Sequence, residues 1–213
     1  MKFIKYYFFL VSLVLIILMD PFMEEIAYGG LISLIMLSIA ASLCILVLSF
    51  QKQVFWTLVV VSFLIILFNF FLLLHPSEKS SILQYASLTI LIFLYAFLLF
   101  YFLMTSGTLS IRDVSNAISI YLLIGIGFGF LYSFIEKVLP GSFVYQAQGT
   151  KDISGDMIYF SFITLTTAGF GDILAVHKLA KVVVMMEVVT GVLYIAIMIG
   201  RLVGIGSGKK QKQ

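Results

Sequence analysis

The sequence predicts an all-α membrane protein with six transmembrane helices. Of its 213 residues, 62% are hydrophobic and 11% are charged, whereas soluble domains are about half apolar and about one-quarter charged. Six runs approach the roughly 20 apolar residues that a membrane span needs. Residues 136–177, between the last two runs, form a connection of mixed polarity, and a connection this long is usually functional. The composition excludes a soluble enzyme, a disordered chain and a nucleic-acid-binding domain.

The six predicted spans are separated mostly by short polar connectors. They cover residues 3–19, 28–50, 54–74, 82–105, 115–135 and 178–204. The first run, which follows Met1 and Lys2, also resembles the basic and hydrophobic regions of a signal peptide. No clear cleavage site follows Asp20 and Pro21, so we expect a retained first helix, with cleavage as the alternative. Cys44 is the single cysteine and lies inside an apolar run, which excludes an intrachain disulfide.

The distribution of charges predicts the orientation of the chain. Loops on the cytoplasmic side of a membrane carry an excess of Lys and Arg. If the N-terminus is cytoplasmic, the cations on the inside are the majority: Lys2, Lys5, Lys52, Arg112, Arg201, Lys209, Lys210 and Lys212. The cations outside are Lys79, Lys137, Lys151, Lys178 and Lys181. We therefore expect a multi-pass protein of the cell membrane with both termini cytoplasmic and residues 136–177 outside.

The connection 136–177 contains a short apolar helix followed by a glycine-containing segment. Residues 155–165 predict the helix, and Ser154 or Asp156 can cap its N-terminus. It is too short to span a membrane, so we expect a re-entrant element. Gly169 and Gly171, two residues apart, permit backbone angles that side chains forbid, so successive carbonyl groups can point the same way. Irregular backbone at membrane depth must be buried in protein or line a watery cavity.

Residues 164–172 read Thr164-Leu165-Thr166-Thr167-Ala168-Gly169-Phe170-Gly171-Asp172. This segment resembles the signature of the potassium-channel pore-domain family, Thr-x-Thr-Thr-Val-Gly-Tyr-Gly-Asp, with Ala168 and Phe170 as the departures. Gly191 lies 20 residues after Gly171, at the spacing of the gating-hinge glycine of that family, and Ala196 also fits. The resemblance covers residues 154–204. It implies six transmembrane helices, a re-entrant pore helix and selectivity-filter loop between helices 5 and 6, and a tetrameric pore.

The resemblance divides the chain into two parts. Residues 1–114 would form a four-helix peripheral transmembrane domain. Residues 115–213 would form the pore domain, with an outer helix at 115–135, a pore helix at 155–165, a filter at 166–172, an inner helix at 178–204 and a short basic tail. The chain would act as a homotetramer among membrane lipids, with no nucleic acid partner, no cofactor, and potassium ions as the permeant ligand.

The resemblance also implies roles for individual residues. Potassium would be held by the carbonyl groups of Thr167, Ala168, Gly169 and Phe170 and by the Thr167 hydroxyl, with Gly171 completing the filter. The residues expected to support the filter are Thr164, Thr166, Asp172 and Tyr159. Gly191 would be the gating hinge, and Glu187, an ionisable residue inside the last span, is a candidate modulatory residue. Glu187 either supports the pore helix or attracts cations, or it is a buried acid at a helix contact.

The function implied is passive potassium-selective conduction, without enzymatic activity. Because Ala168 and Phe170 replace valine and tyrosine, a weakly selective sodium/potassium channel is the first alternative. A non-conducting membrane scaffold or receptor subunit is the second. Voltage gating is not expected, because residues 54–74 and 82–105 contain no Lys or Arg, and a voltage sensor needs several charges within the membrane field.

Three glycines in the fifth predicted span superficially resemble a dinucleotide-binding loop. They occur in Gly125-Ile126-Gly127-Phe128-Gly129, which lies inside an apolar helix with no preceding strand. A dinucleotide fingerprint needs that strand. We therefore interpret these glycines as small residues that allow close packing of helices.

Overall fold

The computed structural model describes residues 4–23, 29–47, 52–105, 111–145 and 156–210. These residues form a chain of helices with two short strands. In chain order the elements are α1 (Ile4–Met23), α2 (Gly29–Val47), α3 (Lys52–Leu74), α4 (Glu78–Thr105), α5 (Ile111–Val138), β1 (Phe143–Tyr145), α6 (Met157–Leu165), β2 (Ile173–Ala175) and α7 (Lys178–Lys210).

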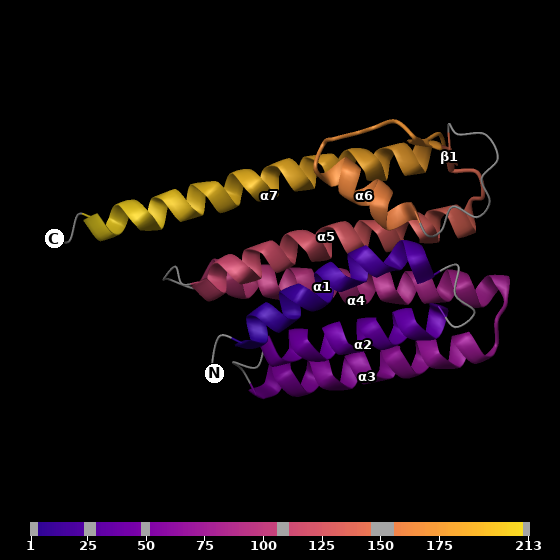
Figure 1. Cartoon of the computed structure of the whole chain (residues 1–213), viewed down its shortest axis with the longest axis horizontal. Helices are drawn as coiled ribbons and strands as arrows, with labels where there is room; N and C mark the ends of the chain where they lie inside the picture. Colours follow the sequence, from indigo (N-terminus) through magenta and orange to yellow (C-terminus); the bar gives the residue numbers. More distant parts are fainter. Residues whose placement is uncertain (1–3, 24–28, 48–51, 106–110, 146–155, 211–213) are drawn as a thin grey trace.

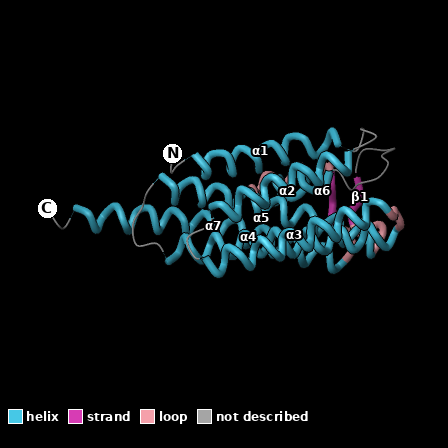
Figure 2. Tube along the Cα trace, turned by 90° about the horizontal axis from the view of Figure 1, so that it is seen from below, coloured by secondary structure: helices cyan, strands magenta, loops and turns pink. Residues whose placement is uncertain are grey.

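Helices α1 to α5 form a bundle around one long axis, and α7 lies along α5 with α6 inserted between them (Figure 1). Each of α1 to α4 packs on the next helix in the chain, α4 packs extensively on α5, and α1 also contacts α5. The start of α1 and the end of α7 lie at one end of the molecule, whereas β1 lies at the other end (Figure 1). Seen from below, the last turns of α7 extend beyond the bundle (Figure 2).

Four helices in the described part of the chain are long and apolar enough to cross a membrane. These segments are Phe55–Leu74, Glu78–Thr105, Asp113–Val138 and Lys178–Arg201. The apolar stretches described in α1 and α2, Lys5–Met19 and Leu34–Val47, are shorter. The membrane character of the chain therefore has structural support, and the number of six spans stays a prediction.

The fold is all-helical as predicted, apart from two short strands that the sequence did not indicate. Strands β1 and β2 pair antiparallel, with Val144 opposite Leu174 at the centre of the register. Each strand has only three residues, which is too short for an alternating pattern to be recognised in a sequence. The pairing joins the segment after α5 to the segment directly after Asp172, so it depends on contacts between distant parts of the chain.

Several helices begin or end outside the apolar runs that predicted them. Helix α4 begins at Glu78, because Ser77 and Ser80 exchange hydrogen bonds across its first turn: the Ser80 N–H donates to Ser77 Oγ at 3.0 Å, and the Ser77 N–H donates to Ser80 Oγ at 2.7 Å. Helix α7 continues to Lys210, beyond the predicted limit at residue 204. Apolarity marks the part of a helix that can lie in a membrane, but backbone hydrogen bonding does not stop where apolarity stops.

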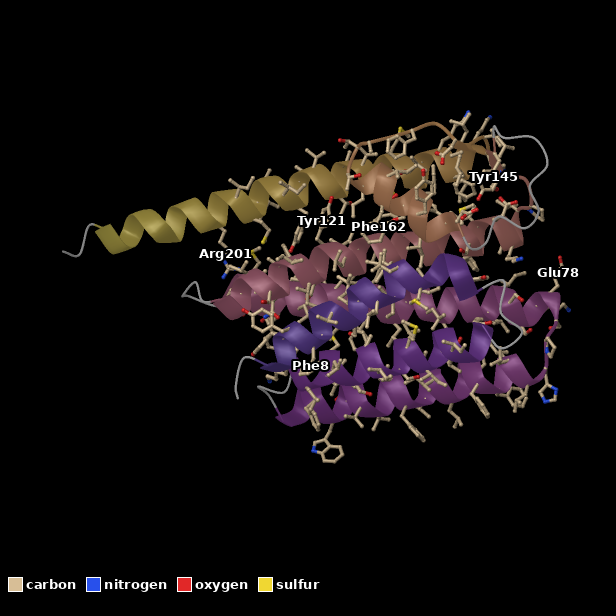
Figure 3. All side chains as sticks on the ribbon, in the orientation of Figure 1. Phe8, Glu78, Tyr121, Tyr145, Phe162 and Arg201 are labelled. Carbon is tan, nitrogen blue, oxygen red and sulfur yellow. The ribbon has the colours of Figure 1, made fainter. Side chains whose placement is uncertain are left out.

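Two glycines on α5 allow α6 to lie unusually close. A Cβ atom added at Gly129 would lie 2.8 Å from the Cα atom of Ile158, and one added at Gly125 would lie 2.6 Å from the ring of Phe162. Phe162 lies between α6 and α5 in Figure 3. The third glycine, Gly127, faces Phe93 of α4. The interpretation of these glycines as packing residues is confirmed.

Replacing Gly129 with alanine is expected to destabilise the protein. The new methyl group would meet the backbone of α6 rather than a flexible side chain, and overpacking of this kind costs about 1–3 kcal/mol. Thermal unfolding of the purified protein in detergent measures the effect. Gly200→Ala is the matched control, because a Cβ atom at Gly200 meets nothing within 4 Å and alanine favours a helix by up to about 1 kcal/mol over glycine. Equal melting temperatures for the two variants would contradict the close contact.

Candidate functional site

Helix α6 is buried on most of its surface between α5 and α7. Met157, Phe160, Ser161 and Leu165 are among its buried residues. Residue 155, expected as the first residue of this helix, and Ser154 lie outside the described residues. Asp156 occupies the N-cap position, but its side chain makes no capping hydrogen bond. The Asp156 carboxylate instead accepts a hydrogen bond from the Tyr145 hydroxyl in β1.

The C-terminus of α6 ends in a Schellman motif that Thr167 completes. The Ala168 N–H donates to the Ile163 carbonyl at 2.8 Å, and the Thr167 N–H donates to the Thr164 carbonyl at 2.9 Å. This pair of bonds requires a left-handed residue after the C-cap, a position that glycine usually occupies. Here the residue is Thr167, with φ of +59°. Positive φ is uncommon for any side chain and an outlier for a β-branched one, so this threonine is held in a costly conformation.

The segment after α6 alternates in backbone conformation. Thr167, Gly169 and Gly171 have φ values of +59°, +51° and +78°, and they alternate with Ala168 and Phe170, whose φ is not positive. Alternation of right- and left-handed residues turns successive peptide groups the same way, which gathers the N–H groups on one side of the chain and the carbonyl groups on the other. A Cβ atom at Gly169 or Gly171 would meet no atom within 4 Å. These glycines are therefore needed for their backbone angles rather than for space.

The carbonyl groups at the end of α6 all have hydrogen-bond partners. Helix ends leave the last four carbonyls without partners inside the helix. The Phe162 carbonyl accepts a hydrogen bond from the Thr166 N–H. The Ile163 and Thr164 carbonyls accept the two Schellman hydrogen bonds already described. The Leu165 carbonyl accepts from the Tyr121 hydroxyl of α5 at 3.4 Å. Gly169 adds a second bond to Ile163 at 3.1 Å. The start of the alternating segment is thus fastened to the helix that precedes it.

The other predicted support residues fall into two groups. Thr164 is buried within α6, and the Thr166 hydroxyl donates to the Phe162 carbonyl at 2.7 Å, so both act locally. Tyr159 and Asp172 come together: the Tyr159 hydroxyl donates to Asp172 Oδ2 at 2.8 Å. This hydrogen bond, followed by burial, raises the pKa of Tyr159. The contact joins the first turn of α6 to the end of the alternating segment.

The sequence did not reveal that Glu136 holds the turn before β1, the strand that pairs with the segment after Asp172. Glu136, near the end of α5, accepts hydrogen bonds from the N–H groups of Gly141 at 2.7 Å and Phe143 at 3.0 Å. It thereby fixes the turn that leads into β1, which pairs with β2 directly after Asp172. Pro140-Gly141 is a turn signal that could have revealed the turn, but nothing in the sequence indicated its partner strand.

Asp156 lies next to β1, where it contacts Tyr145. Burial, followed by the nearby charge of Asp172, raises the pKa of the Asp156 carboxyl. Tyr145, its hydrogen-bond partner, stands at the end of the molecule opposite Arg201 (Figure 3). The Tyr145–Asp156 contact therefore joins the start of α6 to β1, and the Tyr159–Asp172 contact joins the end of the alternating segment to α6.

Gly191 lies buried in the middle of α7, which is helical without interruption from Lys178 to Lys210. A Cβ atom added at Gly191 would lie 2.6 Å from the Leu165 carbonyl oxygen. The glycine thus lets α7 pass directly beneath the C-terminus of α6. Its predicted role as a gating hinge stays a prediction, whereas close packing at this position is visible in the structure.

Glu187 is completely buried where α5, α6 and α7 meet. Its carboxyl group is in hydrogen-bond contact with the Tyr132 hydroxyl of α5 and with the Ser161 hydroxyl of α6. The interpretation as a buried acid at a helix contact describes this position, and its place against Ser161 fits support of α6.

Replacing Thr167 with glycine is expected to stabilise the backbone of the site. Relief of the left-handed conformation is worth about 1–2 kcal/mol, which exceeds the extra freedom of glycine in the unfolded chain, about 0.5–1 kcal/mol. Thermal unfolding in buffer without potassium measures this difference apart from any contact between the hydroxyl and an ion. Thr166→Gly is the control and should lower stability, because Thr166 has an ordinary φ of −82°. A destabilised Thr167→Gly variant would refute the backbone argument.

Part of the chain is similar to a known family. Residues 120–206 match a family model described as "Ion channel". The matched region begins within α5 and includes β1, α6, the alternating segment, β2 and most of α7. No curated protein and no solved structure matches the chain. The match to residues 120–206 supports an ion channel family for this chain.

Proposed function

We propose that the chain is one subunit of a passive potassium-selective channel. The observation that carries the proposal is the alternation of positive φ at Thr167, Gly169 and Gly171 in an exposed segment inside the region that matches ion channels. Selectivity filters are built from backbone carbonyls that replace the hydration shell of an ion, and several adjacent sites permit conduction by knock-on. The proposed ligands are the carbonyl groups of residues 167–170 and the Thr167 hydroxyl.

We propose further that four copies surround the conduction path. One chain supplies one strand of such a filter, and closed rotational symmetry is the usual arrangement of identical subunits. Phe170 is 73% exposed on the single chain, which supports a segment that completes its contacts with other copies. Helix α7 also carries exposed apolar side chains that other copies or lipid would cover, namely Val182, Met185, Met186, Val189, Val192 and Leu193.

The proposed membrane arrangement has α6 as a re-entrant helix among six spans. Helix α6 lies between α5 and α7, and the start of α1 and the end of α7 lie at the same end of the molecule (Figure 1). An even number of crossings would place both termini on the same side of the membrane. We propose that this side is the cytoplasmic one, because it would carry the excess of basic residues.

The main test of the proposal is ion selectivity. Reconstituted in liposomes or bilayers under bi-ionic potassium/sodium conditions, the protein should give a reversal potential displaced strongly toward potassium. A reversal potential near zero would favour the weakly selective alternative, for which the replacement of valine and tyrosine by Ala168 and Phe170 is the motivation. Absence of any flux would favour the non-conducting scaffold or receptor subunit.

A variant of the filter separates conduction from leakage in the same assay. Gly169→Ala should abolish potassium flux, because Gly169 has φ of +51° and an alanine there would move the carbonyl groups out of alignment. Gly200→Ala, in the exposed part of α7, should conduct as the wild type does. Unchanged flux through Gly169→Ala would refute the assignment of the filter.

We also propose that the channel is not gated by voltage. The span Phe55–Leu74 contains no Lys or Arg, and Glu78–Thr105 contains only Lys79, at its first turn. Each charge that moves across the field contributes about 2.3 kcal/mol per 100 mV, and α3 and α4 carry no ladder of such charges. In symmetric potassium, the conductance should therefore change by less than about twofold between negative and positive potentials of physiological size. A steep conductance–voltage curve would contradict this prediction.

A further inference from the structure

The contact of α5, α6 and α7 contains a network of buried polar groups that the proposed filter does not use directly. Tyr132, Ser161 and Glu187 each have a relative exposure of 0%. The Tyr132 hydroxyl bonds Glu187 Oε2, and Ser161 Oγ contacts Glu187 Oε1. Ser161 Oγ also lies 2.7 Å from the carbonyl oxygen of Gly125 in α5. One carboxyl group thus joins three helices.

The number of hydrogens in this network bears on the state of the carboxyl group. A serine hydroxyl has one hydrogen, and a backbone carbonyl oxygen can only accept. If Ser161 donates to Gly125, the contact between Ser161 Oγ and Glu187 Oε1 needs a hydrogen from the carboxyl group itself. A neutral Glu187 satisfies all four groups at once: Tyr132 donates to Oε2, Oε1–H donates to Ser161, and Ser161 donates to Gly125.

The surroundings of Glu187 favour the same state. Its hydrogen bonds among the described residues go to two hydroxyl groups and to no cation. An ionised carboxylate buried without a cation is very costly, and such groups usually become neutral instead. Lys181, on the same helix, is exposed and six residues away, which is a rise of about 9 Å along an α-helix.

The network is placed to control the filter segment through α6. Ser161 precedes Ile163 and Thr164 in α6, and the carbonyl groups of these two residues hold the N–H groups of Thr167, Ala168 and Gly169. A shift of α6 along α5 would therefore shift the start of the filter. The glycine contacts fix how closely α6 approaches α5, whereas the directional hydrogen bonds of Glu187 fix its position along the other two helices.

We propose that Glu187 is a positioning residue that acts as a neutral acid: its protonated carboxyl group locks α6 to α5 and α7 and thereby aligns the filter strands. The proposal rests on the proposed conduction for its effect on selectivity, but the state of the carboxyl group can be measured without conduction.

The closing experiment compares Glu187→Gln with Glu187→Leu. The amide of glutamine can donate an N–H to Ser161 and accept from Tyr132 through its carbonyl oxygen, as a neutral acid would, so Glu187→Gln should keep the potassium/sodium permeability ratio within about twofold of the wild type. Leucine leaves the Tyr132 and Ser161 hydroxyls without their partner, so the ratio should fall by about tenfold or more. Tyr132→Phe and Ser161→Ala each remove one end of the network and should give intermediate losses. Tyr101→Phe, an exposed tyrosine on α4, is the control and should change nothing.

Two results would overturn the proposal by conduction. A Glu187→Gln variant as poorly selective as Glu187→Leu would mean that the charge is required. Wild-type selectivity in Glu187→Leu would mean that the residue does not position the filter. If Glu187→Leu does not assemble, Tyr132→Phe and Ser161→Ala decide the second point, and selectivity equal to that of Tyr101→Phe in both would overturn it.

Infrared spectroscopy tests the carboxyl group independently. At neutral pH the wild type should show the C=O stretch of a protonated carboxylic acid, which Glu187→Gln should lack and which Glu136→Gln, a change at an acid outside the network, should retain. Absence of a difference between the wild type and Glu187→Gln would overturn the neutral acid even in a protein that conducts. Presence of the band in a protein that does not conduct would leave the neutral acid standing and refute only the proposed function.

Discussion

The structure of the site depends on the left-handed conformation of Thr167. This residue directly follows the C-cap of α6, allows the Ile163 and Thr164 carbonyls to accept hydrogen bonds, and starts the alternation that Gly169 and Gly171 continue. A left-handed β-branched residue costs free energy, so the surrounding structure must supply the compensation. The surrounding structure does so through the contacts that α6 makes with α5 and α7.

Those contacts divide into two kinds with different physical roles. At Gly125, Gly129 and Gly191 there is no room for a side chain where α6 meets α5 and α7, so these glycines set the distances between the helices. Glu187 and the Tyr159–Asp172 pair supply hydrogen bonds, which depend on direction and therefore set position along the helices. Both kinds are needed to hold α6 in one place, because close packing alone would still permit it to slide.

The sequence predicted the parts of this arrangement that leave a local pattern. The short apolar helix before Gly169, the glycines that allow unusual backbone angles and the small residues of α5 were all visible in the amino-acid order. Positive φ at Thr167 was not, because only the Schellman hydrogen bonds require it there. The β1–β2 pair and the hydroxyl partners of Glu187 were not predicted either, since each joins residues that are far apart in the chain. The end of α7 was missed for a different reason. Hydropathy indicates which part of a helix can lie in a membrane, but it does not indicate where the hydrogen-bonded backbone of the helix ends.

The hydrogen bond between Tyr145 and Asp156 has a consequence for engineering. It brings together the two residues that flank positions 146–155, so the intervening chain begins and ends at one place whatever its length. Loop closure becomes only about 0.6 kcal/mol more costly for each doubling of loop length. A peptide tag inserted between these two residues would therefore leave the strand pairing and the alternating segment in place. It would label the end of the molecule opposite the start of α1 and the end of α7 (Figure 1).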